Sequence, residues 1–239
     1  VGVVACISPF NFPMTNCAGK IAPALACGNT VVVKPPPQDP MGIGEMCRIL
    51  EAAGFPPGVI NFISGPGPEI GEALTSSPDV DMISFTGSTA VGMKIEEVAA
   101  RTMKRTLQEL GGKSANVVFE DADLDRALQS SMSVWTFHCG QICVAPTRLL
   151  VQESIYEDFT KRMVGAAARL KIGDPHEAGV VMGPLVSRAQ RDRVEQYVGI
   201  GIEEGATLAC GGKRPGHLTR GWYYEPTLFT NARNDMRIA

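Results

Sequence analysis

The sequence predicts an α/β protein with a doubly wound, mostly parallel sheet, followed by part of a second α/β domain. Three observations support this prediction. Short apolar runs rich in β-branched residues alternate with segments of helical spacing, as strand–helix–strand units require. The runs are apolar along their whole length, which is typical of parallel strands covered on both faces. Glycine and proline, 26 and 17 of the 239 residues, cluster at the joints, where turns are expected.

The expected elements alternate regularly as far as residue 110. The segments interpreted as helices carry apolar residues three or four positions apart, which gives each of them an apolar face. Turns are expected at residues 28–29, 54–58 and 65–68, which are rich in glycine, proline or asparagine. The expected strands are residues 2–7, 30–34, 59–63, 82–85 and 105–110, and the expected helices are residues 15–27, 41–53, 69–76 and 89–100.

Gly111 and Gly112 interrupt this pattern, and we expect a domain boundary there, between residues 1–110 and residues 111–239. A second alternating set follows. Asp121 or Asp123 is expected to cap its first helix, because a short carboxylate accepts hydrogen bonds from unpaired helix N–H groups. The expected strands are residues 115–119 and 147–152, with β-like runs at 222–224 and 227–229, and the expected helices are residues 123–138, 155–170 and 187–204.

Composition excludes several classes of function. Lysine and arginine number 22 against 25 acidic residues, a net charge of −3, so no nucleic-acid partner is expected. No apolar run approaches the roughly 18 residues that indicate a membrane span. Seven scattered cysteines fit a reducing cytoplasm better than a disulfide framework. Because Val1 opens directly in an apolar run and the chain stops at Ala239 without a cap or turn, we expect a fragment of a longer protein.

Two features at strand ends are candidates for a ligand site. Residues 85–92, with Ser88 at their centre, join a strand to a helix, where backbone N–H groups and the helix dipole favour an anion. Lys34 ends an apolar strand, and the carboxyl ends of parallel strands form the crevice in which such sheets bind ligands. Each feature alone also fits a structural role: a helix cap for the first, and a lysine whose ammonium reaches water for the second.

Three side chains are candidates for catalysis. Cys143 follows a helix in a glycine-containing turn, where a thiolate is open to small electrophiles; the alternative is a small buried hydrophobe. Glu109, at a strand end, is a candidate general base and otherwise a solvated charge. Asn11 offers an amide to an oxyanion and otherwise serves in a turn. Cys139 lies near Cys143, but the three histidines are too scattered to complete a metal site, so no metal is expected.

Taken together, the order and spacing of five short segments resemble the aldehyde dehydrogenase superfamily. The resemblance covers the whole chain and implies a cofactor domain followed by much of a catalytic domain, in a protein that is a homodimer or homotetramer when full length. The segments are Ser8-Pro9-Phe10-Asn11-Phe12-Pro13, Val33-Lys34-Pro35, residues 85–92, Glu109-Leu110-Gly111-Gly112-Lys113 and Gly140-Gln141-Ile142-Cys143.

The resemblance implies a role for each candidate. Cys143 is the nucleophile that attacks an aldehyde carbonyl, and Asn11 with the backbone N–H of Cys143 holds the resulting oxyanion. Glu109 is the base that activates water, which favours a hydrolytic member over the coenzyme A-using ones. Cofactor contacts are implied at strand ends and adjoining turns: Ile7, Ser8, Pro9, Phe10, Lys34, Gly67, Phe85, Gly87, Ser88 and Leu110.

The cofactor that the resemblance implies is NAD, with NADP as the alternative. Many NAD-preferring relatives carry a glutamate three residues after the lysine, where it binds the ribose hydroxyls. Pro37 stands at that place, so no carboxylate repels a 2′-phosphate. NAD stays ahead on family frequency alone. Phe10 stands where many relatives have tryptophan and keeps the position aromatic.

An apolar aldehyde is the expected substrate. Phe137, Ile142 and Val144 surround Cys143 in the sequence, and no arginine stands in that immediate stretch to pair with a substrate carboxylate. The alternatives are a semialdehyde dehydrogenase of the same family, such as one for succinate semialdehyde, and a non-catalytic truncated relative. A cofactor-free thiol hydrolase, with His138 as its base, is a more remote alternative.

Overall fold

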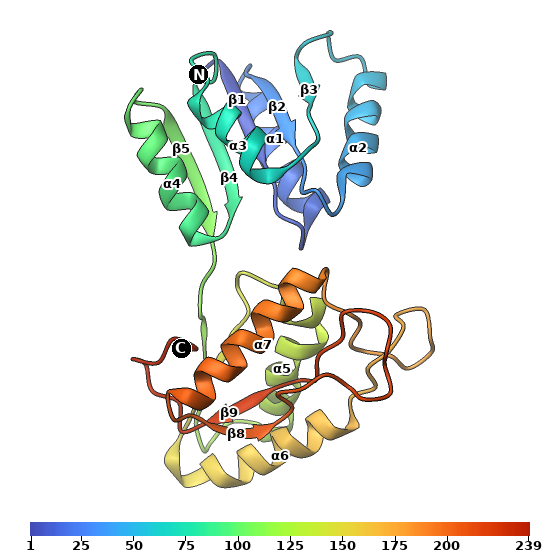
Figure 1. The fold of residues 1–239 in the computed structure, drawn as a ribbon, viewed down its shortest axis with the longest axis vertical. Helices are drawn as coiled ribbons and strands as arrows, with labels where there is room; N and C mark the ends of the chain where they lie inside the picture. The colour runs from blue at the N-terminus through green and yellow to red at the C-terminus, as the bar shows by residue number, and fades with distance from the viewer. The chain divides into compact units, whose positions relative to one another are not determined.

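The computed structural model describes all 239 residues, and the chain divides into two compact units, Val1–Gly111 and Gly112–Ala239 (Figure 1). The first unit contains a five-stranded sheet with strand order β3-β2-β1-β4-β5, in which every neighbouring pair is parallel. Its elements are β1 (Val3–Ile7), α1 (Pro13–Ala26), β2 (Thr30–Lys34), α2 (Pro40–Ala52), β3 (Ile60–Phe62), α3 (Gly67–Ser76), β4 (Met82–Gly87), α4 (Thr89–Ala100) and β5 (Arg105–Leu110). The predicted doubly wound, parallel α/β class is confirmed.

Helices cover both faces of this sheet, and β1 shows why its whole run is apolar. Val4 and Cys6 point to one face, where they pack with Cys17 and Ile21 of α1 and with Ile43 of α2. On the opposite face, the intervening β1 residues pack with side chains of α3 and α4; this second core contains Ala5, Ile7, Leu74, Ile83, Phe85, Ile95 and Ala99. A strand buried on both faces has no solvent side that would require polar residues.

Proline and serine explain where the helices of this unit begin. Helix α1 starts at Pro13, two residues before the predicted start, because proline suits the first helical position, where its missing N–H is not needed. Helix α4 starts at Thr89, as predicted, and the hydroxyl oxygen of Ser88 caps it by accepting a hydrogen bond from the N–H of Val91 (3.4 Å).

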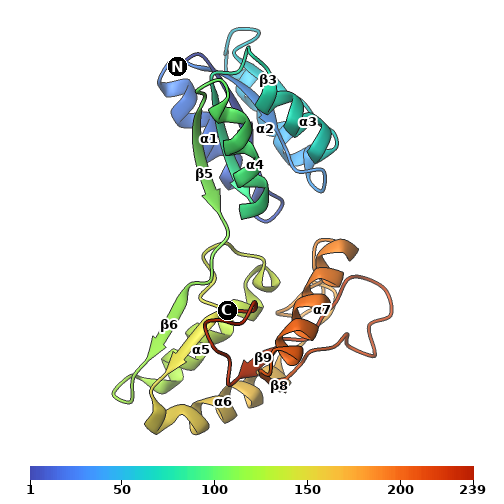
Figure 2. The same ribbon diagram turned by 60° about the vertical axis from the view of Figure 1, so that its left-hand side comes forward.

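The second unit holds two short two-stranded sheets and three α-helices (Figures 1 and 2). Strands β6 and β7 pair in parallel, and β8 and β9 pair antiparallel. The elements are β6 (Ala115–Val118), α5 (Leu124–Thr136), the 3₁₀ turn η1 (His138–Gly140), β7 (Arg148–Val151), the 3₁₀ turn η2 (Glu153–Ile155), α6 (Tyr156–Arg169), α7 (Arg188–Glu203), β8 (Thr207–Cys210) and β9 (Leu228–Thr230).

The main core of this unit lies where α5 and α6 pack together and against β6 (Figure 2). Phe159 and Met163 of α6 are buried there with Trp135 of α5 and Val118 of β6. Asp123 caps α5: its carboxylate accepts a hydrogen bond from the N–H of Arg126 (3.1 Å). Of the two carboxylates that the sequence left open, Asp123 is therefore the cap.

Two expectations for the second unit were wrong, and one strand was missed. The helix expected over residues 123–138 ends at Thr136, because the chain turns into left-handed backbone at His138. Residues 222–224 are not a strand, since the carbonyl of Trp222 accepts from the N–H of Leu185 (3.0 Å) instead of pairing with another strand. Strand β8 was not predicted; its partner β9 lies about twenty residues further along the chain.

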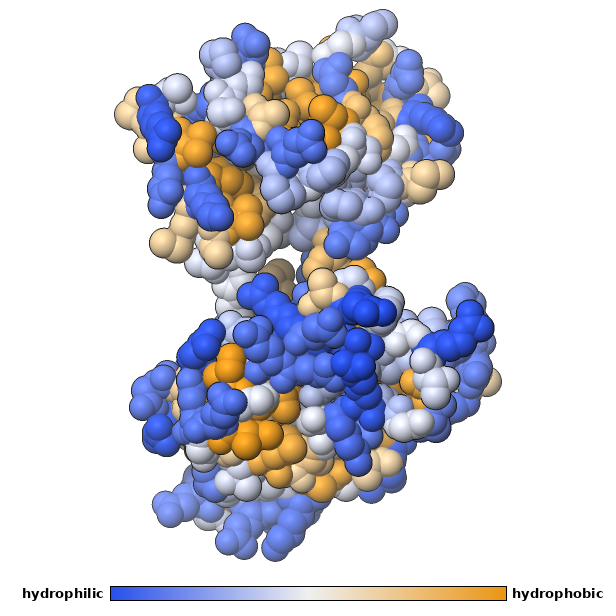
Figure 3. Space-filling model, in the orientation of Figure 1, coloured by the Kyte–Doolittle hydropathy of each residue, from blue (hydrophilic) through white to orange (hydrophobic).

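The surface carries both charged and apolar side chains. On the face drawn in Figure 3, apolar surface shows between charged side chains on each unit. In the second unit, Val117, Phe119 and Leu150, on and beside β6 and β7, are 53%, 60% and 48% exposed. The 239 residues therefore leave one side of this small sheet uncovered. No helix combines the length and the apolar character that crossing a membrane requires.

Candidate functional site

The carboxyl ends of three neighbouring strands in the first unit carry most of the predicted cofactor contacts. In the sheet register, Ile7 of β1 lies opposite both Lys34 of β2 and Phe85 of β4. The N–H of Ser8 donates to the carbonyl of Lys34 (3.2 Å), which continues the pairing one step beyond β1. Pro9 and Phe10 follow in the turn to α1. These residues share the edge of the sheet at which parallel α/β sheets bind ligands.

The turn from β4 to α4 leaves backbone exposed for a ligand. A Cβ atom added at Gly87 would overlap the ring of Phe85, so only glycine fits there without rearrangement. Ser88 and the first turn of α4 follow directly, and the first N–H groups of a helix have no carbonyl partners inside it. Gly67 is the first residue of α3, with open space where a Cβ would lie. These features fit a phosphate-containing cofactor.

Lys34 does not extend into water. Its side chain is buried, and Nζ donates to the carbonyl of Pro35 (3.0 Å). Burial lowers the pKa of Lys34, because removing water disfavours the charged amine. The lysine is thus held at the end of β2 beside Pro37, which lies in the exposed turn that follows.

Lys20 on α1 is a buried cation that the sequence analysis missed. It is 6% exposed, and its ammonium donates to the hydroxyl of Thr86 on β4 (2.5 Å). Thr86 lies opposite Glu109 in the β4–β5 register. Burial lowers the pKa of Lys20, while the nearby Cys6 and Glu109 partly offset this effect. The sequence did contain a signal for this burial, because Lys20 stands three residues after Cys17 and therefore on the apolar face of the helix.

Glu109 and Asn11 lie in different parts of the same unit. Glu109, the next-to-last residue of β5, is exposed. Successive side chains of a strand point to opposite faces of the sheet, so Glu109 points away from α4. Gln108 takes the other side, where its amide donates to the carbonyl of Gly92 (3.0 Å) on α4. Asn11 is half-buried in the turn between β1 and α1. Thr86, which lies opposite Glu109 in the β4–β5 register, accepts from Lys20 of α1, so Glu109 lies on the α1 side of the sheet.

Cys143 lies in the second unit, in a segment that we call the nucleophile turn (residues 138–145). Its side chain is exposed, unlike that of Cys139. The Cys139 thiol donates to the carbonyl of Gly183 (3.3 Å), and burial raises the pKa of Cys139. Of the two thiols, that of Cys143 is the more accessible to a small electrophile. No group of three or more potential metal ligands forms anywhere in the chain.

The nucleophile turn begins with three successive residues in left-handed backbone conformation. The φ angles are 48° for His138, 54° for Cys139 and 76° for Gly140. Glycine adopts this region freely, whereas each L-residue there costs roughly 1–2 kcal/mol. Such conformations persist only where surrounding contacts enforce them, and they concentrate at functional sites.

These features together define the class of protein. A parallel sheet with a helix starting at the end of its central strand is a doubly wound unit of the nucleotide-binding kind. The second unit adds an exposed cysteine on a strained turn. The chain belongs to the aldehyde dehydrogenase family, whose model matches residues 1–239.

Individual relatives support this membership. The chain is 46% identical to betaine aldehyde dehydrogenase of Bacillus subtilis and 47% identical to human retinal dehydrogenase 2, in both cases over its entire length. It spans 49% and 46% of those proteins, about half their length.

Solved structures agree in fold. Betaine aldehyde dehydrogenase of Staphylococcus aureus in complex with NAD+ superposes with a TM-score of 0.97 at 40% identity, over 99% of this chain and 47% of that one. An aldehyde dehydrogenase of Pseudomonas syringae, a cysteine-to-alanine mutant in complex with NAD+ and octanal, gives a TM-score of 0.94 at 40% identity, over 100% and 49%.

Proposed function

We propose that this chain is the cofactor-binding and nucleophile-bearing part of an enzyme that oxidises an aldehyde to a carboxylic acid with NAD. The observation that carries the proposal is Cys143, an exposed thiol on a strained turn in a chain that matches aldehyde dehydrogenases from end to end. Residues 1–110 are assigned to the cofactor domain and residues 111–239 to the catalytic domain.

In the first step, the Cys143 thiolate adds to the aldehyde carbonyl. A C–S bond forms, and the carbonyl π electrons move to oxygen. The amide of Asn11 and the backbone N–H of Cys143 donate hydrogen bonds to this oxyanion, which stabilises charge that develops only as the bond forms. The accessible position of Cys143 suits this role, because the thiol must meet the carbonyl carbon directly.

The residues at the carboxyl ends of β1, β2 and β4 would hold the cofactor. Lys34 is assigned to the adenine ribose and Ser88 to the pyrophosphate, and Gly67 packs on the adenine side. Ile7, Ser8, Pro9 and Phe10 would pass beneath it, and Phe85, Gly87 and Leu110 would complete the wall. When bound, the nicotinamide would accept the hydride of the aldehyde carbon, and the oxyanion of the Cys143 adduct would reform the carbonyl, which leaves a thioester on Cys143. NAD+ in the structures of two relatives supports NAD as the cofactor.

In the last step, Glu109 takes a proton from a water molecule, and the water oxygen attacks the thioester carbonyl. The C–S bond then breaks, releasing the carboxylic acid and the Cys143 thiolate. Lys20 lies on the same side of the sheet as this carboxylate, because its buried amine donates to Thr86, the residue opposite Glu109 in the sheet register.

The substrate is assigned to apolar aldehydes. Phe137 and Val144, on either side of Cys143, are 55% and 71% exposed, so apolar side chains are available to a substrate beside the thiol. The octanal bound by the Pseudomonas syringae relative supports the same class. We assign a homodimer or homotetramer to the full-length protein.

The test is cofactor reduction by the full-length protein with octanal and with succinate semialdehyde, each with NAD and with NADP. We expect NADH formation with octanal, and Cys143→Ala should lower the rate by at least about a thousandfold, because the covalent route is lost. Cys27→Ala, which removes another exposed thiol, is the matched control and should keep its activity. Full activity of Cys143→Ala would refute the thiol mechanism, and reduction with neither aldehyde would favour a non-catalytic relative.

A further inference from the structure

We propose that Gln141 is a positioning residue, whose side-chain amide ties the nucleophile turn to the loop of residues 183–187 and thereby directs the Cys143 thiol. This inference rests on the proposed function, in which Cys143 is the nucleophile.

The Gln141 amide bridges two segments that lie far apart in the sequence. Its Nε2 donates to the carbonyl of His138 (3.0 Å), within the turn. Its Oε1 accepts from the backbone N–H of Val186 (3.1 Å), 45 residues away. The thiol of Cys139 makes a second link to the same loop through the carbonyl of Gly183. The turn that carries Cys143 is therefore tied to the loop at two points.

The loop is itself firmly held. Leu185 is buried in a small core with Val198 of α7 and Tyr224, and its N–H donates to the carbonyl of Trp222. The guanidinium groups of Arg188 and Arg191, in the first turn of α7, lie 5.0 and 5.1 Å from the centre of the Trp222 ring. Cation–π contacts of this kind hold the tryptophan against the helix.

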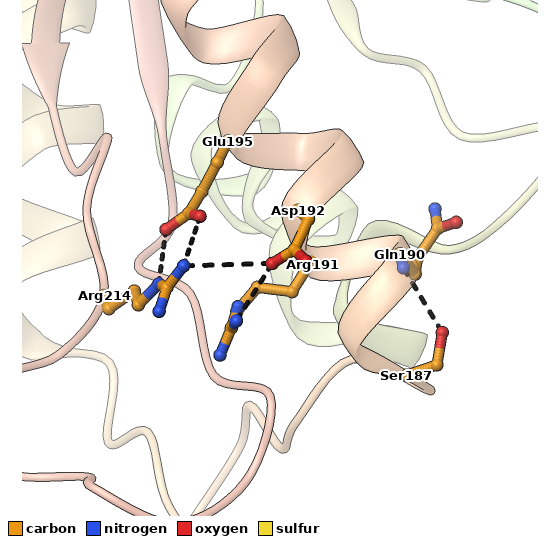
Figure 4. Close-up of polar contacts among 6 residues, drawn as sticks. All are labelled: Ser187, Gln190, Arg191, Asp192, Glu195 and Arg214. Atoms are coloured by element: carbon orange, nitrogen blue, oxygen red, sulfur yellow. Dashed lines mark hydrogen bonds and ion pairs between the residues drawn. The ribbon is translucent and has the colours of Figure 1, made fainter.

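A network of charges fixes the start of α7 (Figure 4). Ser187 caps the helix by accepting from the N–H of Gln190 (3.2 Å). Arg191 pairs with Asp192 (2.9 Å), and Arg214, from the segment after β8, pairs with both Asp192 (3.8 Å) and Glu195 (2.5 Å). The loop thus runs from the buried Leu185 to the fixed start of α7. Through its hydrogen bonds, the Gln141 amide holds the turn against this fixed loop.

The strained backbone explains why such an anchor matters. His138 and Cys139 hold left-handed conformations that L-residues leave unless other contacts enforce them. Gln141 binds the carbonyl of His138 on one side and the fixed loop on the other. If both bonds are removed, the turn keeps the Cys139 link but loses the one nearer Cys143, and the direction of the thiol two residues further on is lost. A displaced nucleophile lowers the rate of the chemical step more than it lowers substrate binding.

The experiment uses the full-length protein with Gln141→Met, which removes both hydrogen bonds at similar volume. Gln141→Glu keeps an acceptor for Val186, and Gln129→Met, an exposed glutamine of α5, is the matched control. We expect Gln141→Met to lower kcat for octanal at least about tenfold, with KM within about threefold. Gln141→Glu should recover much of kcat, and all three variants should melt close to the wild type. A kcat for Gln141→Met within twofold of the wild type would overturn the proposal.

Alkylation by iodoacetamide, followed residue by residue, gives a readout that does not depend on enzymatic activity. Cys143 should react several-fold more slowly in Gln141→Met, whereas the exposed Cys27 should react at the same rate in every variant. Val186→Pro removes the N–H donor from the loop side and should slow Cys143 in the same way. Unchanged Cys143 alkylation in both variants would refute the positioning role. If alkylation is slowed in these variants but the separate variant Cys143→Ala remains active, only the proposed mechanism is refuted.

Discussion

The cysteines of this chain lie in opposite environments, some buried in the core and others exposed. Cys6 and Cys17 are completely buried between β1, α1 and α2, whereas Cys143 is exposed. Burial raises the pKa of Cys6 to about 12 and that of Cys17 to about 11, because the apolar core disfavours a thiolate. These two thiols stay protonated and act as small hydrophobes in the core.

Because these two thiols are buried, we expect the unfolding free energy to fall at alkaline pH. A folded-state pKa above the unfolded value of about 9 means that the folded state retains its protons, so the contribution is complete below pH 9. It is lost as pH rises toward 11–12. Between pH 9 and 10.5, we expect the unfolding free energy to fall by roughly 1 kcal/mol per pH unit for each thiol.

Cys6→Ala should flatten this fall, although the cavity lowers stability at every pH. Cys27→Ala, at an exposed thiol, should leave the slope unchanged. Lys20, whose lowered pKa acts in the opposite direction, is present in both variants, so the difference between their slopes measures Cys6 together with its electrostatic effect on Cys17 and Lys20. Urea unfolding at a series of pH values measures the slopes, and identical slopes for both variants would contradict the assignment.

A few capping side chains and prolines determine where individual helices begin. Ser88, Asp123 and Ser187 each accept a hydrogen bond from a backbone N–H in the first turn of the following helix. Proline starts α1 and α2. These signals are local, because the donor and acceptor lie within three residues of each other.

The cap of α5 allows a matched comparison. Asp123→Ala removes the acceptor for the N–H of Arg126 and should lower the unfolding free energy by about 1 kcal/mol. Asp121→Ala removes a carboxylate two residues earlier, outside the helix, and should change it by less than about 0.5 kcal/mol. Fluorescence of Trp135 and Trp222, both in the second unit, can follow this transition. Equal losses in the two variants would show that the cap contributes little.

At the scale of the whole molecule, the chain consists of two units with separate cores. The first is organised around one continuous parallel sheet, and the second around packed helices with two small sheets. All the proposed cofactor contacts lie in the first unit, whereas the proposed nucleophile lies in the second.

This division predicts where cofactor binding should protect the backbone. With saturating NAD+, hydrogen exchange should slow most at the carboxyl ends of β1, β2 and β4 and in the first turn of α4, because ligand binding stabilises the structure that it contacts. Strands β8 and β9 should exchange at an unchanged rate. Protection that is as strong in β8 and β9 as at the strand ends of the first unit would contradict the assignment of the cofactor contacts.

The sequence alone determined the strand–helix alternation, the parallel class of the first sheet and most helix limits. These properties depend on hydrophobic periodicity and on caps and turns that lie within a few residues of one another. The same local signals marked Lys34, Glu109 and Cys143 as strand-end or turn residues, and the structure has them at such positions.

Only the tertiary structure decided the contacts between distant segments. The burial of Lys20 against Thr86, the pairing of β8 with β9, and the bridge from Gln141 to Val186 each join residues at least eighteen positions apart. The left-handed backbone before Cys143 belongs to the same group, because local preference opposes it and the distant loop at residues 183–187 sustains it. Contacts of this kind leave no periodic trace in the sequence, since they depend on which surfaces meet when the chain packs.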